Sequence, residues 1–372
     1  MRQFPSTIQV CLLFDRANPV DLEALVARFQ GEELPVSYKL VFDTKPGVFY
    51  RLFGQNEVMA TLEYIDRPTN PAHFNAALTA PFVTAATPDA RERIAAHTGY
   101  VLVNVHHGAL PPQGEIGDLL RKLDIKAGAD LGSFKQRLRI AARLGALVCE
   151  MGRPSLVHWT PTDHLLREDA FRLFAAEPIP SLLHFQPLPF GASEDAQGRA
   201  LAGIDVFGAT HFLARDIRVA PSFIPLVATL DPIIAFLRLA TVENGYVVPD
   251  GDTFSPADGS FTFRARHLRA GPRFDGTQGP IIELEPLDYP EHGFRSADFI
   301  APTHSFDDRA VPPVVSARLG QTGASVVADW RKTRRMAEAA GTQLRIKYDP
   351  EKIAPARPSA LRRLLKVVTG GR

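Results

Sequence analysis

The sequence predicts an α+β protein made of two related α/β halves with mostly antiparallel sheets, followed by a basic C-terminal tail. Apolar runs of strand length are separated by hairpin-length turns, which favour antiparallel pairing over a parallel doubly wound sheet. Segments with helical spacing of apolar residues lie between these runs. From Arg331 onward the chain carries twelve Lys and Arg against three Asp and Glu, which distinguishes the tail from the body.

The first hundred residues read as β-α-β-β-β-α-β. "TIQVCLLF" is β-branched and apolar, and "NPVDLEALVARFQ" follows with helical spacing and with Pro19 near its start. The turns "TKPG" and "GQN" separate the next three strands, as they do in hairpins. The predicted strands cover 7–14, 36–43, 48–54, 57–65 and 100–108, and the predicted helices cover 18–30 and 88–97.

The second half alternates strands and helices in the same way, and one junction recurs. A strand ends, a Pro/Ser/Thr/Asn cluster follows and a helix begins, as in "EYIDRPTNPAHFNAAL" and "IRVAPSFIPLVATL". This junction indicates either internal duplication or ordinary helix capping. The predicted helices cover 132–148, 163–177 and 222–244, and the predicted strands cover 155–159, 181–188, 200–208, 211–219, 245–250, 260–266 and 280–287.

These elements divide the chain into four parts. An N-terminal α+β half covers 1–110, and a second α+β half covers 111–300. Residues 301–329 form a linker and the start of a helix, because "SFDDRAVPPVV" is rich in Pro and charge. Residues 330–372 form the basic tail, whose Lys and Arg suit either a solvated terminus or contact with a partner, a nucleic acid or an anionic surface.

Composition favours a protein of the cytoplasm. Hydrophobic residues make up 45% and charged residues 22% of the 372 residues, and the net charge is +1. Cys11 and Cys149 lie in apolar stretches and read as small buried side chains, so no disulfide is expected. No apolar run approaches the length of a membrane span, and the N-terminus lacks the pattern of a signal peptide.

The stretch "GYVVPDGDTFSPADGSFTF" (245–263) places three aspartates within nine residues. Pro249, Asp250 and Gly251 are typical of a tight turn, in which Gly adopts a positive φ. A calcium loop counted from Asp250 would need a Glu at its twelfth position, which is Phe261. We therefore predict a chain reversal with the acids of Asp250 and Asp252 in solvent. A ligand site and an acid–base pair remain the alternatives.

Five further polar residues are candidates for ligand binding. His106 and His107 end a predicted strand, where neighbouring side chains point to opposite faces and do not easily share one metal. His158 lies on a predicted strand, and Asp163 and His164 read as the cap and first turn of a helix. No metal-binding spacing of the H-E-x-x-H or paired-cysteine kind is present, so we expect no metal.

The common signatures of enzymes are missing from the sequence. It contains no G-x-x-x-x-G-K-[ST], no G-x-G-x-x-G after its first strand and no G-x-S-x-G. We therefore expect no nucleotide cofactor and no other cofactor, and catalytic residues stay unassigned.

The order of elements around "GIDVFGATHFLARDIRV", "DPIIAFLRLATVEN" and "VVPDGDTF" resembles a bacterial family catalogued as a domain of unknown function. That family carries a D-G-D-T-type turn after a helix near its C-terminal end. "PVDLEAL" and "VHW" followed by "HLLREDAF" fit the same resemblance, which would cover most of 6–290. It implies a bacterial accessory or immunity-like role and carries over no catalytic residue.

Two functions follow from these observations. We expect a non-enzymatic protein that binds another protein as an accessory, adaptor or immunity-like factor. The alternative is an enzyme or small-ligand binder that uses a cleft between the two halves. Its candidate polar groups are His106, His107, His158, Asp163, His164, Asp250 and Asp252.

Overall fold

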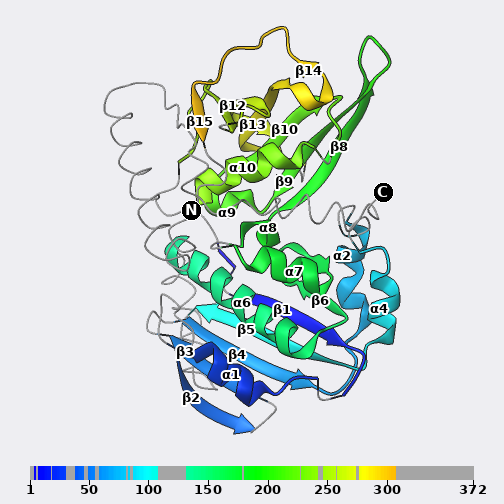
Figure 1. Cartoon of the computed structure of the whole chain (residues 1–372), viewed down its shortest axis with the longest axis vertical. Coiled ribbons are helices and arrows are strands. Elements are labelled where there is room, and N and C mark those ends of the chain that lie inside the picture. Colours follow the sequence, from blue (N-terminus) through cyan, green and yellow to red (C-terminus); the bar gives the residue numbers. More distant parts are fainter. Residues whose placement is uncertain are drawn as a thin grey trace. The chain divides into compact units, whose positions relative to one another are not determined.

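The computed structural model describes residues 4–5, 7–17, 19–30, 38–45, 49–54, 58–80, 83, 87–107, 131–177, 180–226, 228–241, 246–256, 258–273 and 276–306. The chain divides into two compact units, Met1–His184 and Phe185–Arg372. Each unit contains one mostly antiparallel sheet together with helices (Figure 1). The predicted α+β class is therefore confirmed.

The sheet of the first unit has the order β2-β3-β4-β5-β1-β6-β7. Its neighbouring strands are all antiparallel. β1 occupies an inner position because its residues are apolar on both faces and pair with β5 on one side and β6 on the other. The strands are β1 (Thr7–Phe14), β2 (Tyr38–Lys45), β3 (Phe49–Gly54), β4 (Val58–Ile65), β5 (Gly99–His107), β6 (Leu156–Trp159) and β7 (His164–Leu166).

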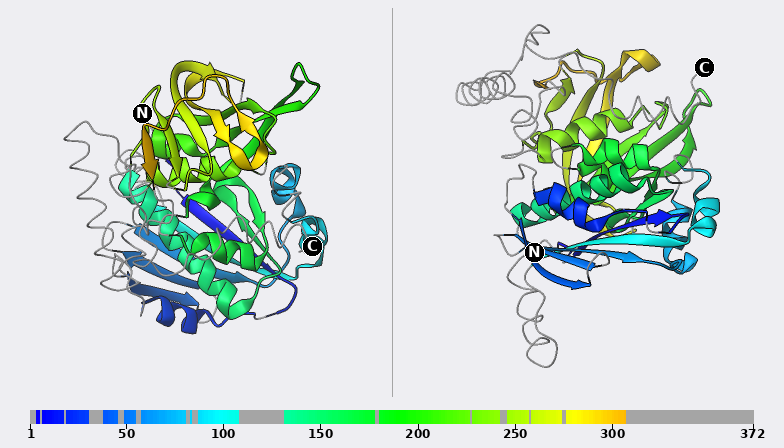
Figure 2. Two further views of the ribbon diagram at one scale, coloured as in Figure 1. Left: turned by 45° about the horizontal axis from the view of Figure 1, so that its top comes forward. Right: turned by 60° about the horizontal axis from the view of Figure 1, so that its bottom comes forward.

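Helices cover both faces of this sheet. The long helix α6 (Leu131–Gly152) runs along one face of the sheet, as Figure 2 shows, with α1 (Leu22–Gln30) and α7 (Glu168–Ala175) beside it. The side chains of Val10 and Phe14 lie on this face, next to Gly145 and Gly152 of α6. Cys11 and Leu13 point to the other face, where they join a core with Phe74 and Ile94. That face is covered by η1 (Pro71–Phe74), α2 (Asn75–Thr79) and α4 (Ala90–Ala96), and the unit also contains η2 (Thr160–Thr162) and α8 (Ser181–His184).

The sheet of the second unit has the order β15-β11-β12-β13-β10-β9-β8, and β14 pairs with β13. β10 is parallel to β13 and β11 is parallel to β15, whereas the other pairs are antiparallel. The elements are β8 (Gln186–Glu194), β9 (Ala200–Phe207), α9 (Ala209–Leu213), β10 (Asp216–Ser222), α10 (Leu230–Thr241), β11 (Thr253–Pro256), β12 (Thr262–Pro272), β13 (Gln278–Tyr289), η3 (Pro290–His292), β14 (Phe294–Arg295) and β15 (His304–Phe306).

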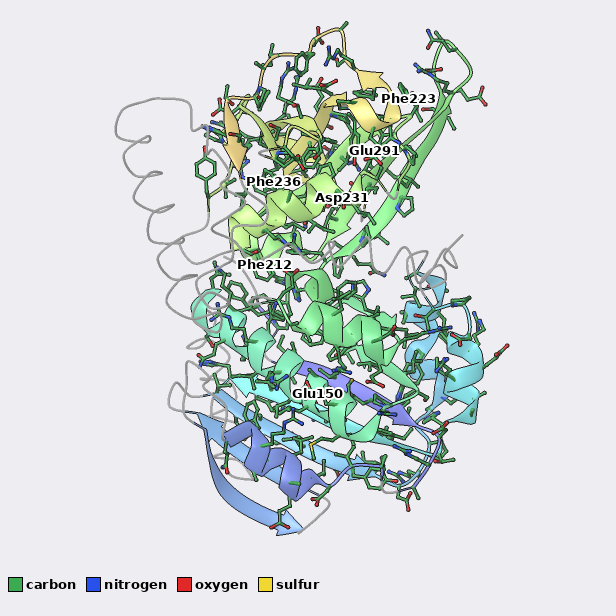
Figure 3. All side chains as sticks on the ribbon, in the orientation of Figure 1. Glu150, Phe212, Phe223, Asp231, Phe236 and Glu291 are labelled. Atoms are coloured by element: carbon green, nitrogen blue, oxygen red, sulfur yellow. The ribbon has the colours of Figure 1, made fainter. Side chains whose placement is uncertain are left out.

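Aromatic side chains form the core of the second unit. Phe236, labelled in Figure 3, comes from α10, and its ring centroid lies 5.4 Å from that of Phe254 on β11. Phe263 on β12 and Phe261 add further ring contacts with Phe254. α10 therefore packs on the face of the sheet that carries Phe254 and Phe263.

Five predicted elements differ from the structure. Residues 246–250 of the strand expected over 245–250 form no strand and lead into the bend at Gly251. The helix expected over 163–177 begins only at Glu168, because Asp163 has a φ of 53° and reverses the chain into β7. Residues expected as strands at 181–188 and 211–219 begin in the short helices α8 and α9. The helix expected over 222–244 begins only at Leu230, since β10 continues to Ser222 and Pro232 lies near the helix start.

The boundary between units falls at His184 and Phe185, whereas the sequence placed it near residue 110. Strands β6 and β7 belong to the first sheet because β6 pairs directly with β1. Residues 301–306, expected as part of a linker, include β15 of the second sheet. The rest of the predicted linker and the basic tail lie outside the described residues, and the relatedness of the two halves stays a prediction.

Candidate functional site

The D-G-D-T stretch forms a tight bend that leads into β11. Gly251 adopts a φ of 81°, as the turn requires, and its N–H donates to the Ala265 carbonyl at 2.8 Å. The Asp252 N–H donates to the Pro249 carbonyl at 3.2 Å, and the Asp252 carbonyl accepts from Ala265 at 2.9 Å. The predicted chain reversal is therefore confirmed.

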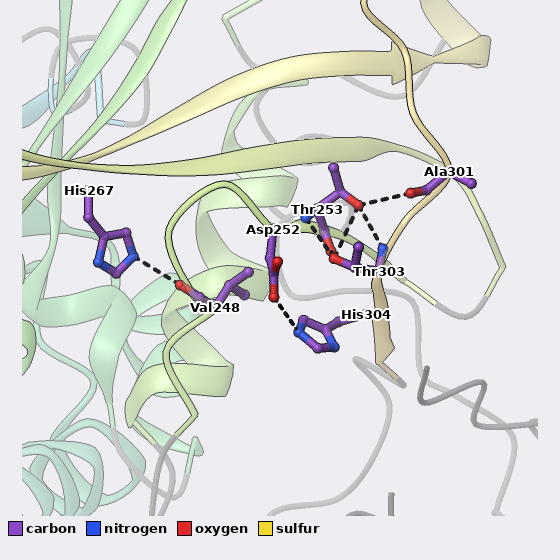
Figure 4. A network of polar contacts seen from close by, with 7 residues as sticks. All are labelled: Val248, Asp252, Thr253, His267, Ala301, Thr303 and His304. Carbon is purple, nitrogen blue, oxygen red and sulfur yellow. Dashed lines mark hydrogen bonds and ion pairs between the residues drawn. The ribbon is translucent and has the colours of Figure 1, made fainter. Parts of the chain in front are cut away.

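The carboxylate of Asp250 stabilises this bend against β12. Its Oδ1 accepts the backbone N–H of His267 at 2.7 Å. The His267 Nε2 in turn donates to the Val248 carbonyl at 2.9 Å, as Figure 4 shows. Two hydrogen bonds to His267 thus join this part of the chain to β12. The Asp250 carboxylate makes one of them, and the Val248 carbonyl makes the other.

The side chain of Asp252 points toward the segment that contains β15. Its Oδ2 lies 2.9 Å from Nε2 of His304, and the two side chains are 35% and 28% exposed (Figure 4). The prediction placed this acid in solvent. Its side chain is partly exposed, but it also pairs with His304, because β15 runs parallel to β11 and places that imidazole beside it. The sequence contained no local signal for the pair, since its members are 52 residues apart.

Thr253 and Thr303 complete the contact between these segments. The Thr253 N–H donates to Thr303 Oγ1 at 2.8 Å, and the Thr303 N–H donates to Thr253 Oγ1 at 2.7 Å. The Thr303 hydroxyl also donates to the Thr253 carbonyl at 2.8 Å, and the Thr253 hydroxyl lies 3.1 Å from the Ala301 carbonyl. We call Asp252, Thr253, Ala301, Thr303 and His304 the clasp.

The two neighbouring histidines of β5 have separate partners. Nδ1 of His106 lies 2.9 Å from Thr7 Oγ1, and Nδ1 of His107 lies 3.0 Å from Ser133 Oγ. Burial lowers the pKa of His106, and the positive charge of Arg137 lowers it further. The two imidazoles do not share a ligand-binding position, as expected from their adjacent places on one strand.

His158 and Asp163 form a second imidazole–carboxylate pair. His158 Nε2 lies 3.1 Å from Asp163 Oδ1, and the Phe74 ring meets the imidazole edge-on at 5.2 Å between ring centroids. Asp163 does not begin a helix, contrary to the prediction: it caps the C-terminal end of η2 in the left-handed conformation, with 43% of its side chain exposed. His164 is buried in β7 and lies opposite Trp159 in register.

Cys11 lies directly opposite His158 in the pairing of β1 with β6. Burial in apolar surroundings raises the pKa of the Cys11 thiol to about 12 and also raises the pKa of Cys149. Both cysteines are free and buried. The Cys11 thiol is therefore protonated at neutral pH and is a poor nucleophile in this structure.

Among the predicted residues, His158 and Asp163 bond to each other, whereas His106, His107, Asp250 and Asp252 bond to residues outside the predicted set. His106, His107, His158, Asp163 and His164 belong to the first unit, and Asp250 and Asp252 belong to the second. Within the described ranges, no three His, Cys, Asp or Glu side chains are arranged to hold a metal ion. Among the same residues, no helix has the length and apolar character needed to cross a membrane.

Comparisons with family models, with curated proteins and with solved structures find no match for this chain. The resemblance to the family with a D-G-D-T-type turn therefore stays a prediction.

Proposed function

We propose that this chain is a non-enzymatic bacterial protein of the cytoplasm that binds another protein as an accessory, adaptor or immunity-like factor. The observation that supports the proposal is how the fold uses its candidate polar groups. Asp250, Asp252 and Thr253 bond to chain segments that they hold in place. A substrate would have to compete with these internal bonds, and breaking the bonds of Thr253, which is fully buried, leaves its polar groups unsatisfied.

Two exposed apolar side chains provide a place to test the proposal. Val247 and Ile300 are 36% and 45% exposed, and they are the exposed large hydrophobic side chains among the described residues. Val247 precedes the D-G-D-T bend, and Ile300 precedes Ala301 of the clasp. Apolar anchors of this kind contribute most to protein association when a partner removes them from water.

Affinity capture from the native host tests this function. The wild-type chain should retain a specific partner, and the double variant Val247→Asp/Ile300→Asp should retain it at least tenfold less. Ala196→Asp, which changes an exposed residue in the β8–β9 turn, is the matched control and should retain the partner. Recovery of no partner by the wild-type chain under mild crosslinking would count against the proposal.

The His158–Asp163 pair favours a second candidate, an enzyme or small-ligand binder. A carboxylate that orients an imidazole is a recurrent arrangement in acid–base catalysis, and non-glycine residues with positive φ occur often at functional sites. A metabolite library screened by thermal shift tests it. A ligand that stabilises the wild-type chain but stabilises neither His158→Gln nor Asp163→Asn would favour this function over protein binding.

The basic tail supports a further function, which is the binding of a nucleic acid or an anionic surface. Its twelve Lys and Arg lie outside the described residues and would bind phosphate groups by releasing counterions. Deletion of 330–372 should then abolish binding to duplex DNA or to vesicles containing phosphatidylserine, and wild-type binding should weaken steeply with salt. Unchanged binding after the deletion would exclude the tail from this role.

A further inference from the structure

Residues Ser296–Phe306, which we call the strap, run along the second unit and end in β15. None of its residues from 296 to 305 is buried. It is attached near its start by the Ser296 N–H, which donates to the Leu287 carbonyl at 2.8 Å, and near its end by the clasp. We infer that the strap opens as a unit and that the β11 edge it uncovers accepts an extended peptide segment in its place.

The backbone pairing of β15 with β11 is short. Three residue pairs join the strands in parallel: Phe254 with His304, Ser255 with Ser305, and Pro256 with Phe306. Parallel pairs are slightly less stable than antiparallel ones, and Pro256 has no N–H to donate. The ladder alone therefore holds the strap weakly, and much of its attachment comes from the side chains of the clasp.

Opening of the strap leaves the rest of the sheet intact. β11 stays paired with β12, where Phe254 lies opposite Phe263, and the Phe254 ring keeps its contact with Phe236 of α10. Local openings of this kind require much less free energy than global unfolding when few buried apolar contacts break. The strap meets that condition because its residues 296–305 are exposed or half-buried.

The uncovered edge has a defined chemistry. Thr253 is fully buried, and its N–H, hydroxyl and carbonyl all bond to the strap in the closed state. Buried polar groups that lose their partners favour any segment that restores the same bonds. An extended peptide with a Thr-His pair replaces the strap by adding a strand, as in β-augmentation.

Hydrogen exchange of the full-length chain, measured by mass spectrometry, tests the opening. Thr303→Val and His304→Gln should each speed exchange in peptides covering 297–306 and 253–256 about tenfold, since each removes bonds of the clasp. Exchange in α10 should not change. Asp298→Asn, an exposed strap residue outside the clasp, is the control and should behave as the wild type. Equal acceleration of the strap and α10 would overturn local opening.

A labelled peptide with the sequence of residues 298–306 tests the exchange of strands. It should bind saturably to the Thr303→Val/His304→Gln double variant and at least tenfold more weakly to the wild-type chain, whose own strap competes. The same peptide carrying both substitutions should not bind the double variant. Equal binding of the two peptides, or no binding to a variant that hydrogen exchange shows to be open, would overturn the proposal. Thr303→Val alone serves if the double variant unfolds. Neither readout depends on the proposed protein partner.

Discussion

Thr253 illustrates how a single buried side chain joins distant parts of this chain. Its hydroxyl and backbone groups bond to Ala301 and Thr303, about fifty residues later in the sequence. Asp252 beside it bonds to His304, so consecutive residues of one turn hold the same returning segment. The acids and hydroxyls of the D-G-D-T stretch therefore have structural roles that their residue types alone do not reveal.

We expect that the bend requires glycine at position 251 because of its backbone conformation, and not because a larger side chain would collide with its neighbours. A Cβ added there would meet no atom within 4 Å, but the φ of 81° is unfavourable for residues with side chains. Gly251→Ala should therefore lower the free energy of unfolding by about 1–2 kcal/mol in urea denaturation. Gly251→Asn should cost less, because Asn tolerates the left-handed region better than Ala. Equal losses in the two variants would contradict this cause.

His106 should make the first unit less stable in mild acid. Its pKa in the folded chain lies below the ordinary 6.5, so the unfolded chain binds more protons between the two values. The contribution of His106 is fully present above pH 6.5 and is lost as the pH falls through the folded pKa. Urea midpoints between pH 7.5 and 5 should fall less steeply for His106→Gln than for the wild type. The exposed His73→Gln is the control.

At the scale of elements, local signals identified most strands and missed the reversal at Asp163. β1, β3, β4 and β5 were predictable because their apolar runs are bounded by turn residues. α1 begins at Leu22 and not near Pro19, since the Asp21 carboxylate accepts the N–H groups of Glu23 and Ala24. β7 was missed because a positive φ at a non-glycine residue has no sequence signature.

The sequence also predicted only part of the candidate site. The bend at Gly251 follows from local turn chemistry, and the sequence identified it. His304 was missed, because a partner 52 residues away is set by the parallel return of β15. The register of β5 separates His106 from His107, which the alternation of a strand did predict.

The contact between α6 and α7 should depend on Gly145. An added Cβ there would lie 2.9 Å from the buried ring of Phe171, closer than packing allows. Ala normally stabilises a helix by about 1 kcal/mol relative to Gly, but crowding typically costs about 1–3 kcal/mol. Gly145→Ala should therefore lower the free energy of unfolding measured by chemical denaturation. Gly132→Ala, at the exposed start of α6, should not lower it. A gain in stability for Gly145→Ala would show that the ring moves freely.

Two prolines in the edge strand β8 hinder the addition of a further strand to the sheet. Pro187 and Pro189 occupy alternate positions opposite Val206 and Ile204 of β9. Prolines in an edge strand present no N–H to a further strand, so this edge is a poor template for pairing with another chain. The β11 edge, which β15 occupies, differs from β8 in this respect because only Pro256 lacks a donor.

At the scale of the whole molecule, each unit has its own sheet and its own core, so calorimetry should show two unfolding transitions. Leu12→Ala should lower only the transition of the first unit, and Phe254→Ala only that of the second. Both side chains are fully buried, and such truncations typically cost about 2–5 kcal/mol. A single transition that both variants shift equally would show that the units unfold together.

The separation of fifty residues between Thr253 and Thr303 also has a kinetic consequence. Contacts that close so long a loop form after β12 and β13 have paired, because the entropy of closure opposes them until then. Interactions absent from the folding transition state change mainly the rate of unfolding. Loss of the threonine pair should thus shorten the lifetime of the native second unit while its refolding rate stays almost unchanged.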